Sequence, residues 1–287
     1  MSDLQYAEVI GDPIAQSKSP AIHNFWIGEL GLQARYESCL VKPVDLPDYI
    51  AERRDDANWR GCNVTMPHKE AVIPLLDRLD PLAERLGSVN TVVREEDGSL
   101  SGYTTDPQGF LEPLRGELAK THLFRMARVI GTGGAARSII AALAEQNFTI
   151  VLAGRNQAKA QSLLDELAPS GKHYVTPLAH FATPTDFPFD DREGCLDLVV
   201  NASALGMVGQ PPLAFHISHA PPGSIIYDIV TVPLMTPLLE AASREDFRFI
   251  DGLAMLIGQA AASFALFFGV APSRADGDAA LRKLLLR

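Results

Sequence analysis

The sequence is poor in cysteine and in positive charge, and each shortage excludes a class of protein. Its 287 residues include three cysteines, Cys39, Cys62 and Cys195, which are scattered singly and form no C-x-x-C pair. So few cysteines argue against a disulfide framework and indicate a reducing compartment. With 25 Lys and Arg against 35 Asp and Glu, the formal net charge is −10. A chain this acidic repels polyphosphate at long range, which disfavours nucleic acid as a partner.

The sequence also has no long uncharged apolar run and no cluster of metal ligands. No apolar stretch reaches the ~18 residues that a membrane span needs. The opening MSDLQYAEVIGDP has no basic segment followed by an apolar run, so we expect no signal peptide. His216 and His219 have a metal-like spacing, but they lie in a Pro-rich stretch without a third ligand. We therefore predict solvated loop histidines, no metal site and a cytoplasmic protein.

Short β-like runs alternate with helical patterns along the chain, which predicts an α/β fold with a mostly parallel sheet. The length of 287 residues suggests two domains. In the first part, strands are predicted at 6–10, 35–41, 61–65 and 91–94, and helices at 21–30, 46–53 and from Pro67. In the second part, strands are predicted at 128–130, 149–153, 196–201 and 224–229, helices at 135–146 and 253–268, and loops at 183–194 and 209–223.

A glycine-rich turn links the predicted strand and helix at the start of the second part. Its spacing matches G-x-G-x-x-A, in which Gly131 permits a tight turn, Gly133 lets the backbone approach a pyrophosphate and Ala136 allows close packing. The alternative is a plain connecting turn, but the strand–turn–helix context favours a dinucleotide site at a helix N-terminus. The predicted cofactor-binding residues of this loop are Gly131, Thr132, Gly133, Gly134, Ala135 and Ala136.

The end of the next predicted strand indicates which dinucleotide binds. It reads Gly154-Arg155-Asn156 and lacks the acid that accepts from the ribose 2′-OH in NAD enzymes. Arg155 can instead clamp a 2′-phosphate with its planar fork of donors. The alternative, a surface arginine beside a helix, leaves the missing acid unexplained. The sequence therefore predicts NADP as the cofactor.

Two ionisable residues are candidates for proton transfer. Lys69 would lie near the N-terminus of the helix predicted from Pro67, where the dipole disfavours its charged form and suits it to proton transfer. Taken alone, Lys69 is better explained as a solvated lysine on a helix surface. Asp106 can pair with Lys69 or share its proton, or it can cap a helix before Pro107, and the two roles are compatible.

Short polar side chains lie at the ends of several predicted elements. Ser17 and Ser19 offer two hydroxyls just ahead of a helix, where they can bind a carboxylate or a phosphate, whereas capping needs only one. Asn63, Thr65 and Asn90 add short neutral groups that suit substrate hydroxyls.

Taken together, these segments resemble the shikimate dehydrogenase family over almost the entire chain. The matching motifs are S-x-S-P-x-x-H-N at 17–24, N-V-T-x-P-x-K at 63–69, V-N-T at 89–91, T-D at 105–106, G-x-G-G-A at 131–135, N-A-[ST]-x-x-G-M at 201–207, Y-D at 227–228 and G-x-x-M-L-x-x-Q-A at 252–260. Several independent motifs in the same order make the resemblance specific.

The resemblance implies a fold and an activity. The fold is an N-terminal α/β substrate-binding domain, residues 1–106 completed by C-terminal helices at 251–287, with a Rossmann-type NADP-binding domain at 107–250 between them. The activity is the reversible NADP-dependent reduction of 3-dehydroshikimate to shikimate, a step of aromatic amino acid biosynthesis in the chorismate pathway. A cytoplasmic monomer or homodimer that binds no nucleic acid and no membrane is expected.

The resemblance also implies residue roles. Lys69 and Asp106 are similar to the family's catalytic pair. The implied substrate-binding residues are Ser17, Ser19, Asn63, Thr65, Asn90, Thr105, Tyr227 and Gln259. Besides the glycine-rich loop and residues Gly154, Arg155 and Asn156, the implied cofactor-binding residues are Asn201, Ser203, Met207 and Gly252.

Four residues, His68, Thr104, Pro107 and Ala204, depart from the family pattern. Thr104 and Pro107 replace the Asn and Gly of the usual N-T-D-G and change the backbone beside Asp106. The alternative is therefore a paralogue with weak shikimate turnover, or one acting on quinate or a related hydroxylated ring acid. More distant alternatives are a methylene-tetrahydrofolate dehydrogenase-like enzyme, which needs a pterin pocket, and a non-catalytic NADPH-binding module, which would not need both Lys69 and Asp106.

Overall fold

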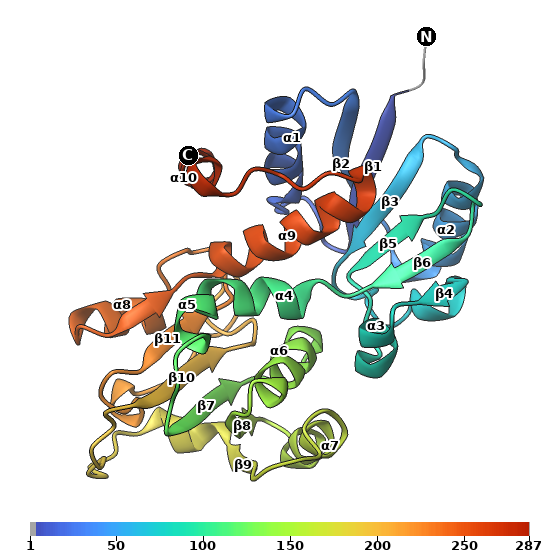
Figure 1. Ribbon diagram of the computed structural model, residues 1–287. Coiled ribbons are helices and arrows are strands. Elements are labelled where there is room, and N and C mark those ends of the chain that lie inside the picture. Colours follow the sequence, from blue (N-terminus) through green and yellow to red (C-terminus); the bar gives the residue numbers. More distant parts are fainter. Residues whose placement is uncertain (1–3, 287) are drawn as a thin grey trace. The chain divides into compact units, whose positions relative to one another are not determined.

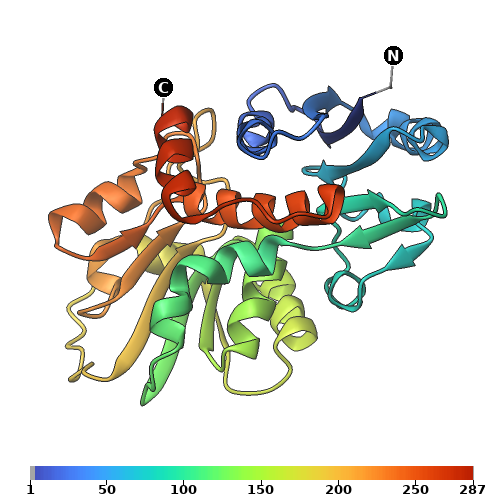
Figure 2. The same ribbon diagram turned by 45° about the horizontal axis from the view of Figure 1, so that its top comes forward.

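The computed structural model describes residues 4–286, which form two compact units (Figures 1 and 2). The first unit contains the chain up to Thr105 and again from Ile257 onward, and the second contains residues 106–256. The first unit is therefore built from two separate segments, and the second from one continuous segment.

The first unit contains a mixed six-stranded sheet in the order β2-β1-β3-β5-β6-β4. Its strands are β1 (Gln5–Gly11), β2 (Ala34–Leu40), β3 (Trp59–Val64), β4 (Arg78–Leu79), β5 (Thr91–Arg94) and β6 (Leu100–Tyr103). β1 is parallel to β2 and β3, whereas β5 is antiparallel to β3 and β6. The carboxyl ends of β1, β3 and β6 and the amino end of β5 therefore lie at one edge of the sheet.

Helices bury apolar side chains against this sheet. They are α1 (Ser19–Glu29), α2 (Leu46–Asp55), α3 (Pro81–Leu86) and the second part of α9 (Gly252–Phe268), while α10 (Ala275–Leu285) packs against α1. Leu46, Tyr49 and Ile50 recur at the helical period and pack with Ile10 and Trp59. Glu8 of β1 is buried, and its carboxylate accepts from Tyr49 Oη (2.8 Å) and Arg53 Nε (2.9 Å), which compensate its loss of hydration.

A second set of aromatic side chains packs between α1, β2 and α9. The His23 ring stacks on Tyr36 with centroids 4.0 Å apart, and Trp26 meets Phe264 edge-on at 5.6 Å. His23, Trp26 and Phe264 are almost completely buried. At 17 residues α9 is the apolar helix expected at 253–268, and within residues 4–286 no helix is both long and apolar enough to cross a membrane.

The helix predicted from Pro67 is wrong. Residues 66–72 form successive turns, followed by a short 3-10 helix at Ile73–Leu75. The carbonyl of Lys69 accepts from the backbone N–H of Val89 (2.9 Å), which occupies an acceptor that a continuing helix would use, and Ile73 N–H bonds to Glu70 three residues back. Lys69 therefore does not lie at a helix N-terminus, and the dipole argument made for it does not apply.

The second unit contains a parallel six-stranded sheet in the order β12-β11-β10-β7-β8-β9. Its strands are β7 (Phe124–Ile130), β8 (Thr149–Gly154), β9 (Tyr174–Pro177), β10 (Cys195–Asn201), β11 (Ile225–Asp228) and β12 (Arg248–Ile250). Its helices are α4 (Asp106–Leu111), α5 (Arg115–Leu118), α6 (Gly134–Glu145), α7 (Gln157–Leu167), α8 (Pro237–Arg244) and the start of α9. This is the predicted α/β architecture with a Rossmann-type sheet.

Helices that pack on the strands of the second sheet explain why these strands are apolar along their whole length. α6 and α7 pack against β7, β8 and β9, and α8 packs against β11 and β12 (Figure 1). Strands covered on both faces read as continuous apolar runs, as β10 does with six buried residues of seven.

The two histidines of the Pro-rich loop behave differently from each other. His216 is exposed, as predicted, but His219 is buried, so the prediction of a solvated side chain is wrong for His219. Its Nε2 lies 2.8 Å from the Thr183 carbonyl, and its ring packs against Phe181 and His180. A backbone acceptor in a long-range contact explains its burial. Within residues 4–286, no group of His, Cys, Asp and Glu has the arrangement of a metal site.

Candidate active site

The carboxyl edge of the first sheet brings together most of the residues that sequence analysis assigned to a substrate. They lie at the end of β3, follow β1, β3 or β6, or precede the antiparallel β5, and α9 adds one more. These residues are Ser17, Ser19, Asn63, Thr65, Lys69, Asn90, Thr105 and Gln259. Ligands bind outside the carboxyl ends of strands in open α/β sheets, so this edge is a candidate substrate site.

Asn63, at the end of β3, is held on several sides. Its Oδ1 accepts from Tyr36 Oη (2.6 Å), and its Nδ2 lies within hydrogen-bonding distance of Ser263 Oγ (2.8 Å), Thr91 Oγ1 (3.1 Å) and the Asn90 carbonyl (3.2 Å). Three acceptors thus surround two amide hydrogens. An amide oxygen has two lone pairs, so Asn63 retains one acceptor position on Oδ1.

Asn90 is held in a similar way from the side of β6. Its Oδ1 accepts from the backbone N–H of Thr105 (2.8 Å) and from Thr91 Oγ1 (3.0 Å). Its Nδ2 donates to Thr105 Oγ1 (2.9 Å) and, over 3.4 Å, to Gln259 Oε1. The structure therefore joins Asn63, Asn90, Thr105 and Gln259 in one polar network.

Two members of this network were not predicted. Thr91 and Ser263 are fully buried, and their hydroxyl oxygens lie 3.0 Å apart. Ser263 lies in the apolar α9, 172 residues from Thr91, and donates to the Gln259 carbonyl four residues back (3.0 Å). A serine among apolar helix residues was the available signal, since a buried hydroxyl requires a partner.

The loop that carries Lys69 is anchored by its neighbour His68. The His68 ring is fully buried, and Nε2 lies 2.7 Å from the Val41 carbonyl. Because a carbonyl only accepts, Nε2 carries the proton and donates. The backbone bond from Val89 to the Lys69 carbonyl adds a second anchor. These contacts account for the ring at position 68 and hold the Lys69 backbone against Val89, the residue before Asn90.

Ser17 and Ser19 occupy the turn into α1. Ser17 Oγ accepts from the backbone N–H of Ser19 (3.3 Å), the first residue of α1, but the N-cap is Lys18 and no side chain makes a capping bond there. Thr65, after β3, packs over Gly11 so closely that a Cβ at Gly11 would lie 2.5 Å from its methyl group. Both hydroxyl-bearing segments are therefore held at the ends of adjacent strands.

The chain passes into the second unit at Asp106, which begins α4 and is buried. Pro107 is the second residue of this helix, where no intrahelical N–H bond is required, so proline is accommodated. Thr104 is also buried, and within the described part of the chain its Oγ1 has no hydrogen-bond partner.

The glycine-rich loop of the second unit is shaped by missing side chains. Gly131 has φ +123°, and a Cβ there would lie 2.8 Å from the Ala202 carbonyl oxygen. A Cβ on Gly133 would have no atom within 4 Å among the described residues. Gly131 is thus required by its neighbours, whereas Gly133 leaves open space over the N-terminus of α6, which suits a phosphate.

The three residues predicted at the end of β8, Gly154, Arg155 and Asn156, have different surroundings in the structure. Asn156 caps α7, since its Oδ1 accepts from the Lys159 backbone N–H (3.0 Å). Arg155 is exposed and, within residues 4–286, takes part in no hydrogen bond or ion pair. A Cβ on Gly154 would press on the Thr132 methyl group at 2.8 Å. Asn156 is thus the helix cap, and exposed Arg155 is compatible both with a contact to a 2′-phosphate and with a surface arginine beside a helix.

The loop after β10 is held by buried Asn201, a predicted cofactor-binding residue, together with Asp228, to which the sequence assigned no role. Asn201 Nδ2 donates to the Leu205 carbonyl and to Asp228 Oδ1, both at 2.9 Å, and its Oδ1 accepts from Ser203 Oγ (2.7 Å). Asp228 also accepts from Thr236 Oγ1 (2.7 Å), yet burial raises the pKa of its carboxyl. Asn201 therefore shapes the loop that carries Ser203 and Met207.

Tyr227 and Gly252 lie in the second unit. Tyr227 is fully buried and stacks on Phe110 at 4.9 Å, and within the described residues its hydroxyl has no partner. Burial raises the pKa of this phenol. A Cβ on Gly252 would lie 2.4 Å from the Val230 carbonyl oxygen, so close packing at the start of α9 explains this glycine.

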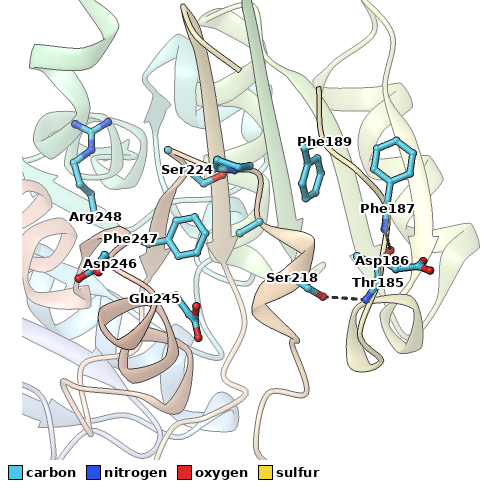
Figure 3. Close-up of a pocket in the computed structure, with 13 residues that line it drawn as sticks. Thr185, Asp186, Phe187, Phe189, Ser218, Ser224, Glu245, Asp246, Phe247 and Arg248 are labelled. Atoms are coloured by element: carbon cyan, nitrogen blue, oxygen red, sulfur yellow. Dashed lines mark hydrogen bonds between the residues drawn. The ribbon is translucent and has the colours of Figure 1, made fainter. Parts of the chain in front are cut away.

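A separate pocket of about 530 Å³ lies at the amino ends of β11 and β12 (Figure 3). Phe187 and Phe189 line one side, and Glu245, Asp246 and Phe247 line the other. The glycine-rich loop follows the carboxyl end of β7 in the same parallel sheet, so it lies at the opposite edge. This pocket contains none of the residues assigned from the sequence.

Two family models match the chain. The shikimate dehydrogenase substrate binding domain matches residues 9–92, and the shikimate 5′-dehydrogenase C-terminal domain matches residues 252–282. The first match covers the strands and loops that carry Asn63, Lys69 and Asn90. The second covers α9, which carries Gln259.

Individual proteins are similar over nearly the whole chain. The shikimate dehydrogenase (NADP(+)) of Sphingopyxis alaskensis is 46% identical over 283 residues, which cover 98% of this chain and 97% of that protein. The protein of the same name from Paramagnetospirillum magneticum is 40% identical, covering 94% and 95%. A crystal structure of shikimate 5-dehydrogenase from Thermus thermophilus, in complex with NADP(H) and shikimate, aligns with a TM-score of 0.82 at 32% identity, covering 98% and 99%.

Proposed function

The chain belongs to the shikimate dehydrogenase family, and we propose that it binds its substrate at the carboxyl edge of the first sheet, with Lys69 and Asp106 responsible for proton transfer. It is an NADP-dependent oxidoreductase that interconverts 3-dehydroshikimate and shikimate. The observation that carries the site assignment is the polar network around Asn63 and Asn90. Its short amide and hydroxyl groups match the hydroxyls of a small ring acid.

The substrate carboxylate is assigned to Ser17 and Ser19. A chain with a net charge of −10 needs local donors to hold an anion, and these residues supply hydroxyls at the start of α1. The first N–H groups of a helix also favour anions. Thr65, Thr105, Gln259 and the two amides are assigned to the ring hydroxyls, and Tyr227 is also assigned to the substrate.

Lys69 is assigned the proton of the reacting oxygen. Oxidation of the alcohol releases a hydride and a proton, and the amine of Lys69 removes the proton from the hydroxyl oxygen. In reduction the Lys69 ammonium returns it to the alkoxide oxygen. Asp106 follows Thr105 directly and is assigned to support Lys69 in this exchange.

The second unit is assigned to the cofactor, which when bound accepts or supplies the hydride. The residues from Gly131 to Ala136 form a loop with open space over Gly133, where a pyrophosphate would meet helix N–H groups. Exposed Arg155, with Gly154 and Asn156 beside it, would hold the 2′-phosphate of NADP. Asn201, Ser203, Met207 and Gly252 are assigned to the nicotinamide side.

The experiment that tests this proposal is steady-state kinetics with shikimate and quinate, each with NADP and with NAD. We expect kcat/KM to be highest for shikimate with NADP. If neither acid is oxidised at saturating NADP, the site assignment fails and a different hydroxylated acid must be sought. The three free cysteines are compatible with a cytoplasmic location, where thiols stay reduced. We also propose that the enzyme is a monomer or a homodimer, and light scattering would measure its mass in solution.

A further inference from the structure

One buried hydroxyl, that of Thr91, connects the two amides of the proposed substrate site. Thr91 is fully buried at the start of β5. Its Oγ1 lies 3.1 Å from Asn63 Nδ2 and 3.0 Å from Asn90 Oδ1. From these contacts we infer that Thr91 is a positioning residue, whose hydroxyl fixes the orientation of both amides and thereby determines which ring hydroxyls the enzyme accepts. The inference rests on the proposed function.

The polarity of the network is set by a backbone group. The Thr105 N–H bonds to Asn90 Oδ1 at 2.8 Å, and an N–H can only donate, so this end of the Asn90 amide must be its oxygen. The Thr91 hydroxyl therefore donates its single hydrogen to that oxygen. Its lone pairs are left to face Asn63, which must present its NH₂ group to Thr91.

The opposite side of Asn63 agrees with this orientation. Asn63 Nδ2 lies 3.2 Å from the Asn90 carbonyl, so a flipped amide would bring two acceptors together. Tyr36 Oη donates to Asn63 Oδ1 at 2.6 Å. Ser263 Oγ supplies a further acceptor for the NH₂ group at 2.8 Å. Asn63 therefore offers a substrate the remaining lone pair of its oxygen, which selects a hydroxyl that donates.

The consequence is a rule for substrate choice. A ring hydroxyl at Asn63 can donate to the carbonyl oxygen, whereas an ether or a ketone oxygen at the same position would face another acceptor. Without the Thr91 hydroxyl, one link between the two amides is lost and the orientation of Asn63 is less well defined. Binding of the correct polyol should weaken while the fold persists.

Two pairs of side chains at position 91 differ chiefly in the hydroxyl. Thr and Val have the same branched shape, and Ser and Ala share an unbranched one. We expect Thr91→Ser to bind shikimate within about twofold of wild type. Thr91→Val and Thr91→Ala should raise the shikimate Kd and KM about tenfold, the equivalent of one ordinary hydrogen bond. KM for NADP should stay unchanged in all three variants.

The control is Ser88→Ala. Ser88 is a buried serine of the same unit, and its hydroxyl has no partner among the described residues. Its removal should leave shikimate binding unchanged. The thermal midpoint of each variant is compared with its affinity for shikimate. Thr91→Ser loses a buried methyl group, which should lower its thermal midpoint, but it keeps the hydroxyl, which should preserve binding. If binding followed stability, Thr91→Ser would weaken with the others.

Isothermal titration with shikimate decides the outcome. Tight binding by Thr and Ser with weak binding by Val and Ala supports the inference, and the Ser–Ala pair suffices if Thr91→Val does not fold. Wild-type affinity in Thr91→Ala, or equal weakening in Thr91→Ser and Thr91→Ala, overturns the inference alone. A wild-type enzyme that neither binds nor oxidises shikimate overturns the proposed function and this inference with it.

Discussion

At the carboxyl edge of the first sheet, Asn63, Asn90 and Thr105 are held by one another's side chains, with hydroxyls inserted between amides. At the carboxyl edge of the second sheet, the loop at Gly131 is shaped by backbone and by the absence of side chains. The first arrangement offers donors and acceptors that suit a small polar molecule. The second offers open space and backbone N–H groups that suit a phosphate. Substitutions in the first unit should therefore act through lost hydrogen bonds or protons, and in the second mainly through steric clash or lost charge.

The largest expected effect belongs to the chemistry of the first unit. Lys69→Met keeps the long side chain and removes the amine, so kcat should fall about 10²–10⁴-fold, the usual contribution of a positioned acid–base group. KM for NADP should change little, because the residues proposed to bind the cofactor belong to the other unit. Steady-state kinetics of shikimate oxidation measure both values. Near-wild-type kcat with an unaltered pH profile would assign the proton to another group, with Asp106 first to be tested.

The next effect tests charge in the second unit. Arg155→Ala should lower the preference for NADP over NAD by about 10–150-fold, since a charge-assisted contact contributes roughly 1.5–3 kcal/mol. The ratio of kcat/KM for the two cofactors measures it. Lys159→Ala, which removes another exposed cation nearby, is the control and should leave the ratio intact. An unchanged ratio in Arg155→Ala would show that this arginine does not read the 2′-phosphate.

Two glycines of one loop separate steric cost from ligand contact. Gly131→Ala forces a Cβ to 2.8 Å from the Ala202 oxygen at φ +123°, so it should destabilise the second unit by roughly 1–3 kcal/mol. Gly133→Ala meets open space and should leave the thermal midpoint unchanged while weakening NADP binding, because its methyl group occupies the approach to the backbone. Thermal unfolding with cofactor titration distinguishes the two. Equal midpoints for both variants would refute the steric account of Gly131.

The smallest effect concerns the pH dependence of the first unit. Burial lowers the pKa of His23 to about 3, whereas the unfolded chain takes up a proton near pH 6.5. Stability should therefore fall as pH drops below 6.5, by about 2 kcal/mol at pH 5. His23→Phe keeps an aromatic ring on Tyr36 and removes this titration.

Urea unfolding at pH 7 and pH 5 measures this loss of stability. Unfolding is monitored by the fluorescence of Trp26 and Trp59, which both lie in the first unit. The free energy of unfolding of His23→Phe should be close to that of wild type at pH 7 and larger than that of wild type at pH 5. Asp228 of the second unit provides the contrast. Its raised pKa gives a contribution that is present below pH 3.8 and is lost as pH rises through the folded value. Parallel pH dependence in wild type and His23→Phe would contradict the account of His23.

Much of the fold could be predicted because buried strands leave an apolar pattern. Residues 149–153 and 196–201 were predicted as strands, and β8 and β10 extend each by one residue. β4 has only two residues, Arg78–Leu79, and carries no such pattern, because its place depends on pairing with β6. The helix predicted after Pro67 was wrong for a similar reason, because a distant partner decides the local structure. The Lys69 carbonyl accepts from the N–H of Val89, twenty residues further along the chain.

The candidate site was predictable where a residue type implies its chemistry. The amides and hydroxyls near Asn63 and Asn90 were found from their positions after or before strands, and they do lie together. The places of Thr91 and Ser263 in this network could not be predicted. Thr91 contacts Asn63 across 28 residues of sequence, and Ser263 contacts it across 200. Spacing cannot reveal such partners, and a serine in an apolar helix gives only a weak signal.

The division of the first unit into two chain segments has a consequence for synthesis on the ribosome. A nascent chain that has emerged as far as Thr105 lacks the aromatic residues of α9 that cover Trp26, because 151 residues (106–256) intervene. At roughly 5–20 residues per second, translation of that stretch takes about 8–30 s. Meanwhile the second unit, being continuous, can fold alone. The half of the enzyme that is made first is thus completed last, and the apolar surface that α9 covers stays exposed for that interval.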